Sequence, residues 1–123
     1  MILALHHVQL AMPKGREADA RAFYRDTLEM TEEPKPHHLA KRGGAWFAAG
    51  DARVHLGVED DFRPAKKAHP ALLVAELSSI AERCRARGFA VSTDEPLAGY
   101  DRVYVSDPFG NRLELLQKRD KAR

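Results

Sequence analysis

The sequence lacks the features of a disulfide-stabilised, membrane-spanning or nucleic-acid-binding protein. Cys84 is the only cysteine, so no disulfide can form within the chain. The apolar start, residues 1–5, is followed at once by two histidines and is far too short for a secretory signal or a membrane span. The 20 basic and 18 acidic residues leave a net charge of +2, and no basic stripe with interleaved aromatic residues occurs. We therefore expect a cytoplasmic protein without a nucleic-acid or membrane partner, and a solvated tail at residues 118–123.

What is present is the composition of one globular domain. The chain has 123 residues, of which 44% are hydrophobic and 31% are charged. That length supports one domain with its own core, residues 1–123, but not two ordinary domains. The single cysteine falls on the apolar stripe of a predicted helix, so we expect Cys84 to be a buried structural thiol.

The first half of the chain predicts a strand, a helix and three further strands. Residues 3–12 alternate in polarity like a strand, and residues 20–28 place apolar side chains at helical spacing. Pro34 and Pro36 end this helix. Glycine-containing turns then separate three runs typical of strands, at residues 37–42, 45–49 and 53–59.

The same order of elements returns after a charged linker, residues 60–67. Residues 69–75 form an apolar strand pattern, and a helix follows in which Ser79 and Glu82 have the spacing of a capping box. Gly88 suits the position after the helix end. Strands are predicted at residues 89–93, 101–106 and 112–117. The chain thus contains one unit twice, module one at residues 3–59 and module two at residues 68–118, which predicts a single α+β domain.

Four residues that are able to bind a metal occupy matching places in the two modules. His7 and His69 open the first strand of each module and are 62 residues apart. His55 and Glu114 lie in the last strand of each module and are 59 residues apart. Strand alternation puts all four on the face opposite the predicted core.

This shared face favours a metal site over four unrelated surface residues. Any one of the strand histidines alone would more often be a surface or hydrogen-bonded side chain. Imidazole and carboxylate together suit one divalent ion such as zinc, nickel, iron or manganese. Three protein ligands would leave coordination positions open for water or substrate, as a catalytic metal requires.

Three stretches resemble the glyoxalase/bleomycin resistance/dioxygenase (vicinal oxygen chelate) superfamily. They are residues 5–11 (LHHVQLA), residues 23–30 (FYRDTLEM) and, most specifically, residues 107–115 (DPFGNRLEL). The similarity covers residues 3–117. It implies two βαβββ modules that form a cupped eight-stranded mixed sheet around a metal held by His7, His69 and Glu114. In glyoxalase I-like members a glutamate usually occupies the place of His55, so His55 is either a fourth ligand or a general base.

Further site residues follow from strand parity. Val103 and Val105 are expected to face the helix, which directs Arg102 and Tyr104 to the metal side. Arg102 suits a substrate carboxylate or phosphate, and a surface ion pair is the alternative. Tyr104 suits a catalytic proton donor, and packing is the alternative. Gln9 lies two residues beyond His7 and is a candidate substrate contact.

The resemblance implies an enzyme acting on a small oxygen-chelating substrate, of lyase or isomerase type, as the first hypothesis. An extradiol-type dioxygenase with iron on two histidines and one carboxylate is the second. A thiol transferase of the type that confers fosfomycin resistance is a further alternative, but this sequence contains no distinctive cation-binding loop to support it. A drug-binding resistance protein without a metal is the non-catalytic alternative. The resemblance also implies a homodimer, in which modules pair within one chain or between subunits.

Overall fold

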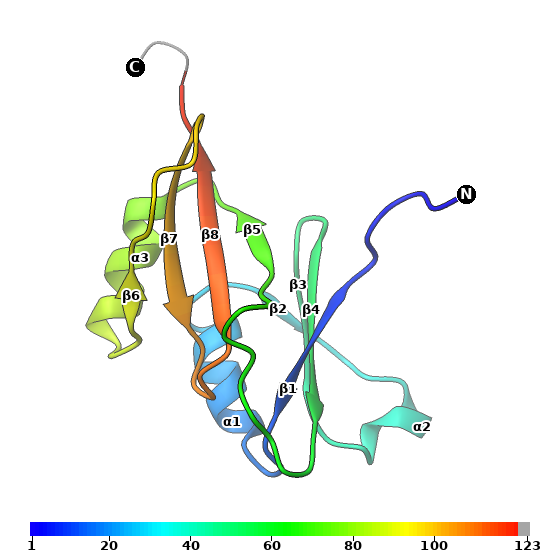
Figure 1. Cartoon of the computed structure of the whole chain (residues 1–123). Coiled ribbons are helices and arrows are strands. Elements are labelled where there is room, and N and C mark those ends of the chain that lie inside the picture. Colours follow the sequence, from blue (N-terminus) through cyan, green and yellow to red (C-terminus); the bar gives the residue numbers. More distant parts are fainter. Residues whose placement is uncertain (121–123) are drawn as a thin grey trace. The chain divides into compact units, whose positions relative to one another are not determined.

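The computed structural model describes residues 1–120; the last three residues of the expected solvated tail lie outside the described residues. The chain divides into two compact units, Met1–Pro64 and a second that begins at Ala65. Each unit contains a four-stranded mixed sheet (Figure 1). The α+β class expected from the sequence is confirmed, and residues 1–120 contain eight strands as expected, although one lies at a different place and hydrogen bonding divides them into two sheets of four.

The first unit follows the βαβββ order, with one additional short helix. Its elements are β1 (Val8–Met12), α1 (Glu17–Ala20), the π-helical turn η1 (Arg21–Arg25), β2 (Thr31–Glu33), α2 (His37–Ala40), β3 (Ala45–Ala49) and β4 (Ala52–Val58). The sheet order is β1-β4-β3-β2, in which β1 and β4 are parallel and the other pairs antiparallel.

Aromatic side chains on η1 pack against one face of this sheet. Phe23 and Tyr24 are fully buried and meet edge to face at 4.8 Å. Tyr24 also stacks on Phe47 of β3, with ring centroids 5.3 Å apart. Because side chains alternate along a strand, the neighbouring Trp46 points to the opposite face of the sheet. The helical layer therefore takes one face and leaves the other for the polar residues.

The strand expected at residues 37–42 is wrong, because His37–Ala40 form the short helix α2. Pro36 stands at its N-cap, and its carbonyl accepts the backbone N–H groups of Leu39 and Ala40 at 2.9 and 3.1 Å. The strand that completes the sheet lies earlier, at Thr31–Glu33, where it pairs with Trp46 to Ala48. This edge strand ends just before Pro34, which has no N–H to donate to a further ladder hydrogen bond.

The second unit has the same βαβββ order without the additional helix. Its elements are β5 (Ala71–Leu73), α3 (Leu77–Ala86), β6 (Val91–Ser92), β7 (Tyr100–Ser106) and β8 (Arg112–Lys118). The sheet order is β5-β8-β7-β6, with β5 and β8 parallel. Helix α3 lies beside β6 and β7 (Figure 1) and buries Leu77, Ala81 and Cys84. Val103 and Val105 are buried, as expected for the helix-facing side of β7.

The capping box expected at Ser79 and Glu82 is wrong, because the N-cap of α3 is Glu76 and Ser79 lies within the helix. The N–H of Leu77 instead donates to the side-chain oxygen of Gln117 on β8, at 2.8 Å. This tertiary hydrogen bond satisfies one of the free N–H groups of the first turn. At the other end, Gly88 has a φ of +84°, which agrees with its predicted place after the helix end.

The DPFGN turn between β7 and β8 is held by the buried Asp107. Its carboxylate accepts the backbone N–H groups of Phe109 and Asn111, at 2.9 and 2.8 Å. The side-chain amide of Asn111 donates to the other carboxylate oxygen at 3.0 Å. This turn fixes the register in which Tyr104 of β7 lies opposite Glu114 of β8.

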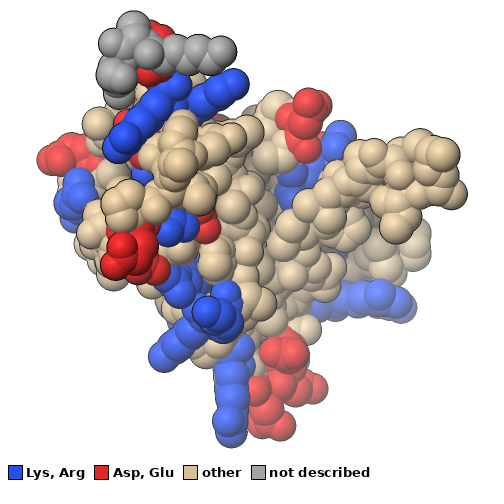
Figure 2. All heavy atoms as spheres, turned by 45° about the horizontal axis from the view of Figure 1, so that its top comes forward, with Lys and Arg blue, Asp and Glu red and all other residues tan. Residues whose placement is uncertain are grey.

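No helix among residues 1–120 is long and apolar enough to cross a membrane. Basic and acidic side chains are interspersed on the face shown in Figure 2.

Cys84 is buried, as predicted for a structural thiol, and burial raises the pKa of its thiol against the opposing effect of Arg83, Arg85 and Arg87. We expect the folded protein to react with a disulfide reagent at pH 8 at least about 100-fold more slowly than the urea-unfolded chain, because only an exposed thiolate attacks. Absorbance of the released thiol measures the rate, and Cys84→Ser gives the blank. Labelling at the unfolded rate without urea would contradict this.

Candidate functional site

In the first unit, three aromatic rings form a column across the face opposite η1. His55 of β4 lies between His7, with ring centroids 4.1 Å apart, and Trp46 of β3, also at 4.1 Å. The register explains this, because Gln9 and Trp46 are the direct cross-strand neighbours of His55, and His7 precedes Gln9 by two residues on the same face. His7 itself is exposed, and its Nδ1 lies 2.9 Å from Nδ1 of His6.

His55 is held as a neutral imidazole with free edges. Burial lowers its pKa below the ordinary histidine value, and the adjacent His7 lowers it further. Both ring faces are covered, and the side chain makes no hydrogen bond to any of the described residues, 1–120. A neutral imidazole with an available lone pair can accept a proton or bind a metal.

In the second unit, the side chains of His69 and Glu114 face each other. Nδ1 of His69 lies 2.8 Å from the backbone carbonyl of Lys67, and Nε2 lies 3.0 Å from Oε1 of Glu114. A carbonyl only accepts, so Nδ1 of His69 carries a hydrogen and donates it to Lys67, while Nε2 faces the carboxylate of Glu114. At 3.0 Å these two atoms form a hydrogen bond when Nε2 carries a proton, and without that proton they lie side by side as two candidate metal ligands.

The carboxylate of Glu114 is fixed by a second partner. Arg102 Nη1 donates to Oε2 of Glu114 at 3.2 Å and to the phenol oxygen of Tyr104 at 3.0 Å. The same guanidinium also donates to the carbonyl of Glu95. Burial raises the pKa of Glu114, but the hydrogen bonds from His69 and Arg102 lower it by more, so this pKa lies below its ordinary value. Glu114 is thus a carboxylate with one oxygen held by Arg102 and the other facing His69.

Tyr104 lies on the same face as these groups. It is the cross-strand neighbour of Glu114, its ring meets that of His69 edge to face at 5.4 Å, and the guanidinium of Arg112 lies 3.7 Å above it. Because its oxygen accepts from Arg102, its own O–H hydrogen can be donated elsewhere. Arg102 and Tyr104 therefore lie on the same face of the second sheet as Glu114, and the guanidinium is engaged with that carboxylate.

The two units place their candidate ligands at equivalent positions in their sheets. The residue two positions after His7, Gln9, pairs with His55, and the residue two positions after His69, Ala71, pairs with Glu114. On the next strand Trp46 matches Tyr104. His55 and Glu114 are therefore equivalent in register as well as in sequence spacing. Each unit supplies a pair of candidate ligands, and within residues 1–120 no group of three or more histidine, cysteine, aspartate or glutamate side chains is arranged to hold a metal.

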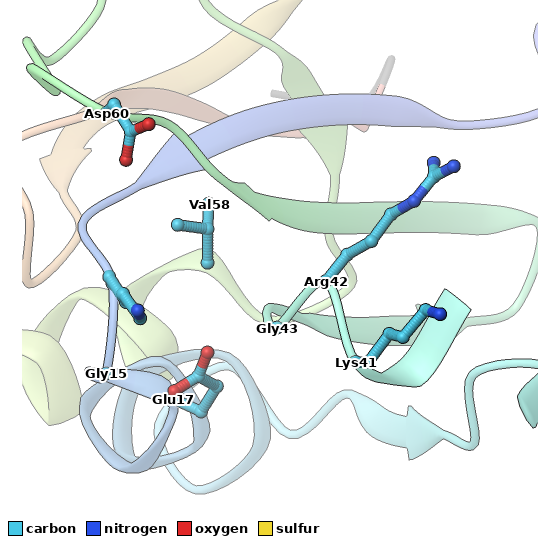
Figure 3. A pocket seen from close by; sticks show the side chains of 8 residues that line it. Gly15, Glu17, Lys41, Arg42, Gly43, Val58 and Asp60 are labelled. Carbon is cyan, nitrogen blue, oxygen red and sulfur yellow. The ribbon is translucent and has the colours of Figure 1, made fainter. Parts of the chain in front are cut away.

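Two cavities lie in the first unit, and both include basic residues that sequence reasoning did not single out. One, of about 280 Å³, is bordered by Gln9 and Trp46 on the histidine face together with Lys35 and Arg42. The other, of about 460 Å³, is lined by residues from three separate stretches of the first unit (Figure 3), namely Lys14, Gly15, Glu17, Lys41, Arg42, Gly43, Val58 and Asp60. Lys35 and Arg42 flank helix α2, which was predicted to be a strand, and no motif marked them.

Comparisons with known proteins agree with this architecture. The family profile of the Glyoxalase/Bleomycin resistance protein/Dioxygenase superfamily matches residues 4–115. A crystal structure of a glyoxalase family protein from Bacillus anthracis is 45% identical, with a TM-score of 0.91, and the match covers 97% of this chain and 98% of that one. The search of curated proteins found no match.

More distant structures share the fold. The fosfomycin resistance protein FosX from Listeria monocytogenes, in complex with Mn(II) and sulfate, is 18% identical with a TM-score of 0.74, covering 97% of this chain and 93% of that one. TnmS3, an antibiotic binding protein from Streptomyces sp. CB03234, is 22% identical with a TM-score of 0.70, covering 96% and 100%. Together with the repeated βαβββ unit, the profile match shows that the chain belongs to the glyoxalase/bleomycin resistance protein/dioxygenase superfamily.

Proposed function

We propose that the protein is a divalent-metal-dependent enzyme of lyase or isomerase type that acts on a small substrate chelating the metal through two oxygens. The proposed ligands are His7 from a first unit and His69 and Glu114 from a second unit, with His55 as the fourth polar group. The observation that carries the proposal is the pair formed by His69 and Glu114, whose Nε2 and Oε1 atoms lie 3.0 Å apart.

Three features of the His69 and Glu114 pair support a metal site. Ligands at about 2.0–2.1 Å from one ion lie roughly 3 Å apart, which the Nε2 to Oε1 distance matches. Metal-binding histidines usually donate their other N–H to a carbonyl, as His69 does to Lys67. The lowered pKa of Glu114 keeps it ionised at neutral pH, as binding requires.

The other side chains have supporting roles. Arg102 positions the carboxylate of Glu114, while Tyr104 donates a hydrogen bond to an anionic oxygen of the substrate. His55 acts as the general base, because it is neutral and its ring nitrogens are free. Gln9 contacts the substrate from beside His55. When bound, the metal supplies Lewis-acid stabilisation of an enolate-like anion.

We further propose a homodimer. Each unit presents one pair of candidate ligands, so a complete site needs one first unit and one second unit, from the same chain or from two chains. Light scattering should give twice the mass of one chain. Mixing His7→Ala with Glu114→Ala protein under exchange conditions should restore metal binding to a fraction of sites if the units of different chains pair.

Elemental analysis of untagged protein tests the function directly. After removal of metal with a chelator, we expect about one zinc, nickel, iron or manganese ion to rebind per chain, with an affinity that falls at acidic pH as the ligands take up protons. A protein that holds none of the four ions would end the metal-enzyme proposal in favour of a drug-binding protein. Oxygen uptake with catechols by the iron form would instead favour the dioxygenase, since two histidines and one carboxylate also suit iron.

A further inference from the structure

We propose that the smaller cavity of the first unit binds a small organic oxyanion, with Lys35 and Arg42 as the anion-binding residues and Trp46 as the wall for its apolar part. The inference rests on the proposed function only in taking this ligand to be the substrate. The cavity adjoins the proposed chemistry, because Gln9 and Trp46 on its wall are the two cross-strand neighbours of His55.

The charged residues that line the cavity are all basic. Its lining contains two cations and no acidic residue, namely Gln9, Lys35, Leu39, Arg42, Gly43, Trp46, Leu56, Gly57 and Val58. Lys35 donates to the carbonyl of Gly43, and its ammonium lies 6.0 Å from the centre of the Trp46 ring. These contacts hold the Lys35 charge at the cavity wall without neutralising it.

Arg42 is the cation of the cavity whose side chain no other described residue engages. Its guanidinium makes no ion pair or hydrogen bond within residues 1–120. In Figure 3 its side chain extends away from Glu17 and Asp60, the two acidic residues of the neighbouring cavity. A free planar guanidinium that borders a cavity suits the two oxygens of a carboxylate or the oxygens of a phosphonate.

The rest of the cavity limits the size and shape of the ligand. A volume of about 280 Å³ admits a small molecule, and the Trp46 ring with Leu39 and Val58 offers apolar contact. Gly57 leaves room for the side chain of Gln9, because a Cβ at position 57 would lie 2.5 Å from the Gln9 amide nitrogen. The amide can therefore lie over β4 and donate to the ligand.

The larger cavity supplies matched controls. Lys14 and Lys41 border it but not the smaller one, and the acidic Glu17 and Asp60 lie among them. Lys41 is the direct chain neighbour of Arg42, so its removal changes the local charge equally without touching the proposed site.

Trp46 is the only tryptophan, so its fluorescence reports on this cavity and on the His55 ring stacked against it. Benzoate, phenylphosphonate and the neutral benzamide are titrated in the presence of a chelator. We expect saturable binding of at least one anion and at least about tenfold weaker binding of benzamide, because a charged hydrogen bond is lost. Comparing the two anions shows whether a carboxylate or a phosphonate fits.

Variants of the lining residues show which side chains bind the anion. Arg42→Met and Lys35→Met should each weaken anion binding by about tenfold, and Gly57→Ala should also weaken it by displacing Gln9. Lys14→Met and Lys41→Met should stay within about twofold, since exposed charges at a distance are screened. Equal binding of benzamide, or equal losses in Lys41→Met and Arg42→Met, would overturn the inference. Since the chelator is present, absence of metal binding contradicts only the proposed enzyme, whereas absence of anion binding contradicts only this site.

Discussion

Replacing Glu114 or His69 with alanine is expected to lower the affinity for a divalent metal at least about 100-fold, because each removes one of three proposed ligands and loss of a mere supporting group already costs 10–100-fold. Metal content after dialysis and competition with a coloured chelator measure the change. Glu114→Gln keeps the size of the side chain and its acceptor for Arg102 but loses the charge, so we expect nearly the same loss. That variant separates the ligand role from the packing of a side chain that is only 7% exposed.

Two further variants make this test specific. His38→Ala removes an exposed histidine of α2 that has no place in the proposed set, and it should bind metal like the wild type. Arg102→Met should weaken binding by about tenfold, because Arg102 orients Glu114 without being a ligand itself. Unchanged affinity in both Glu114→Gln and His69→Ala would refute the ligand assignment.

Replacing Phe47 with alanine is expected to destabilise the protein by about 3–5 kcal/mol, the usual cost of removing a buried phenylalanine. Phe47 is fully buried between the sheet and η1 and stacks on Tyr24 at 5.3 Å. The surrounding aromatic rings cannot collapse into the space without losing these contacts. Urea unfolding followed by circular dichroism gives the change in the free energy of unfolding.

The matched control is Phe47→Leu, which keeps most of the volume and should cost less than about 1.5 kcal/mol. A stability loss below 1 kcal/mol in Phe47→Ala would mean that the core of the first unit is not centred on this ring. Because a small domain is stable by only about 5–15 kcal/mol, the full loss would consume a large share of that margin.

Alternation and repetition were enough to predict most of the fold. Because side chains alternate along a strand, His55 points to the face opposite its core neighbours Val54 and Leu56, whatever the tertiary arrangement. The 62- and 59-residue offsets then relate the two modules, and the observed register of Gln9 with His55 and of Ala71 with Glu114 makes the same correspondence. These features are local or periodic, so they can be read from one sequence.

The errors arose where a distant partner decides local structure. Residues 37–40 are helical because the preceding strand ends at Glu33 and Pro36 caps the first helical turn. The N-cap of α3 is Glu76 and not the predicted Ser79. Gln117 on β8 supplies the hydrogen-bond acceptor that the capping box would have supplied locally.

The sequence by itself thus determined the repeated βαβββ unit and, within each unit, the side of the last strand on which His55 or Glu114 lies, because side-chain direction follows from strand period. Only the tertiary structure decided how those side chains are used. The carbonyl of Lys67 sets the tautomer of His69, Arg102 takes one oxygen of Glu114, and Trp46 covers His55. Each of these contacts joins groups that lie on different strands or loops, and their distances are set by packing rather than by the order of residues along the chain.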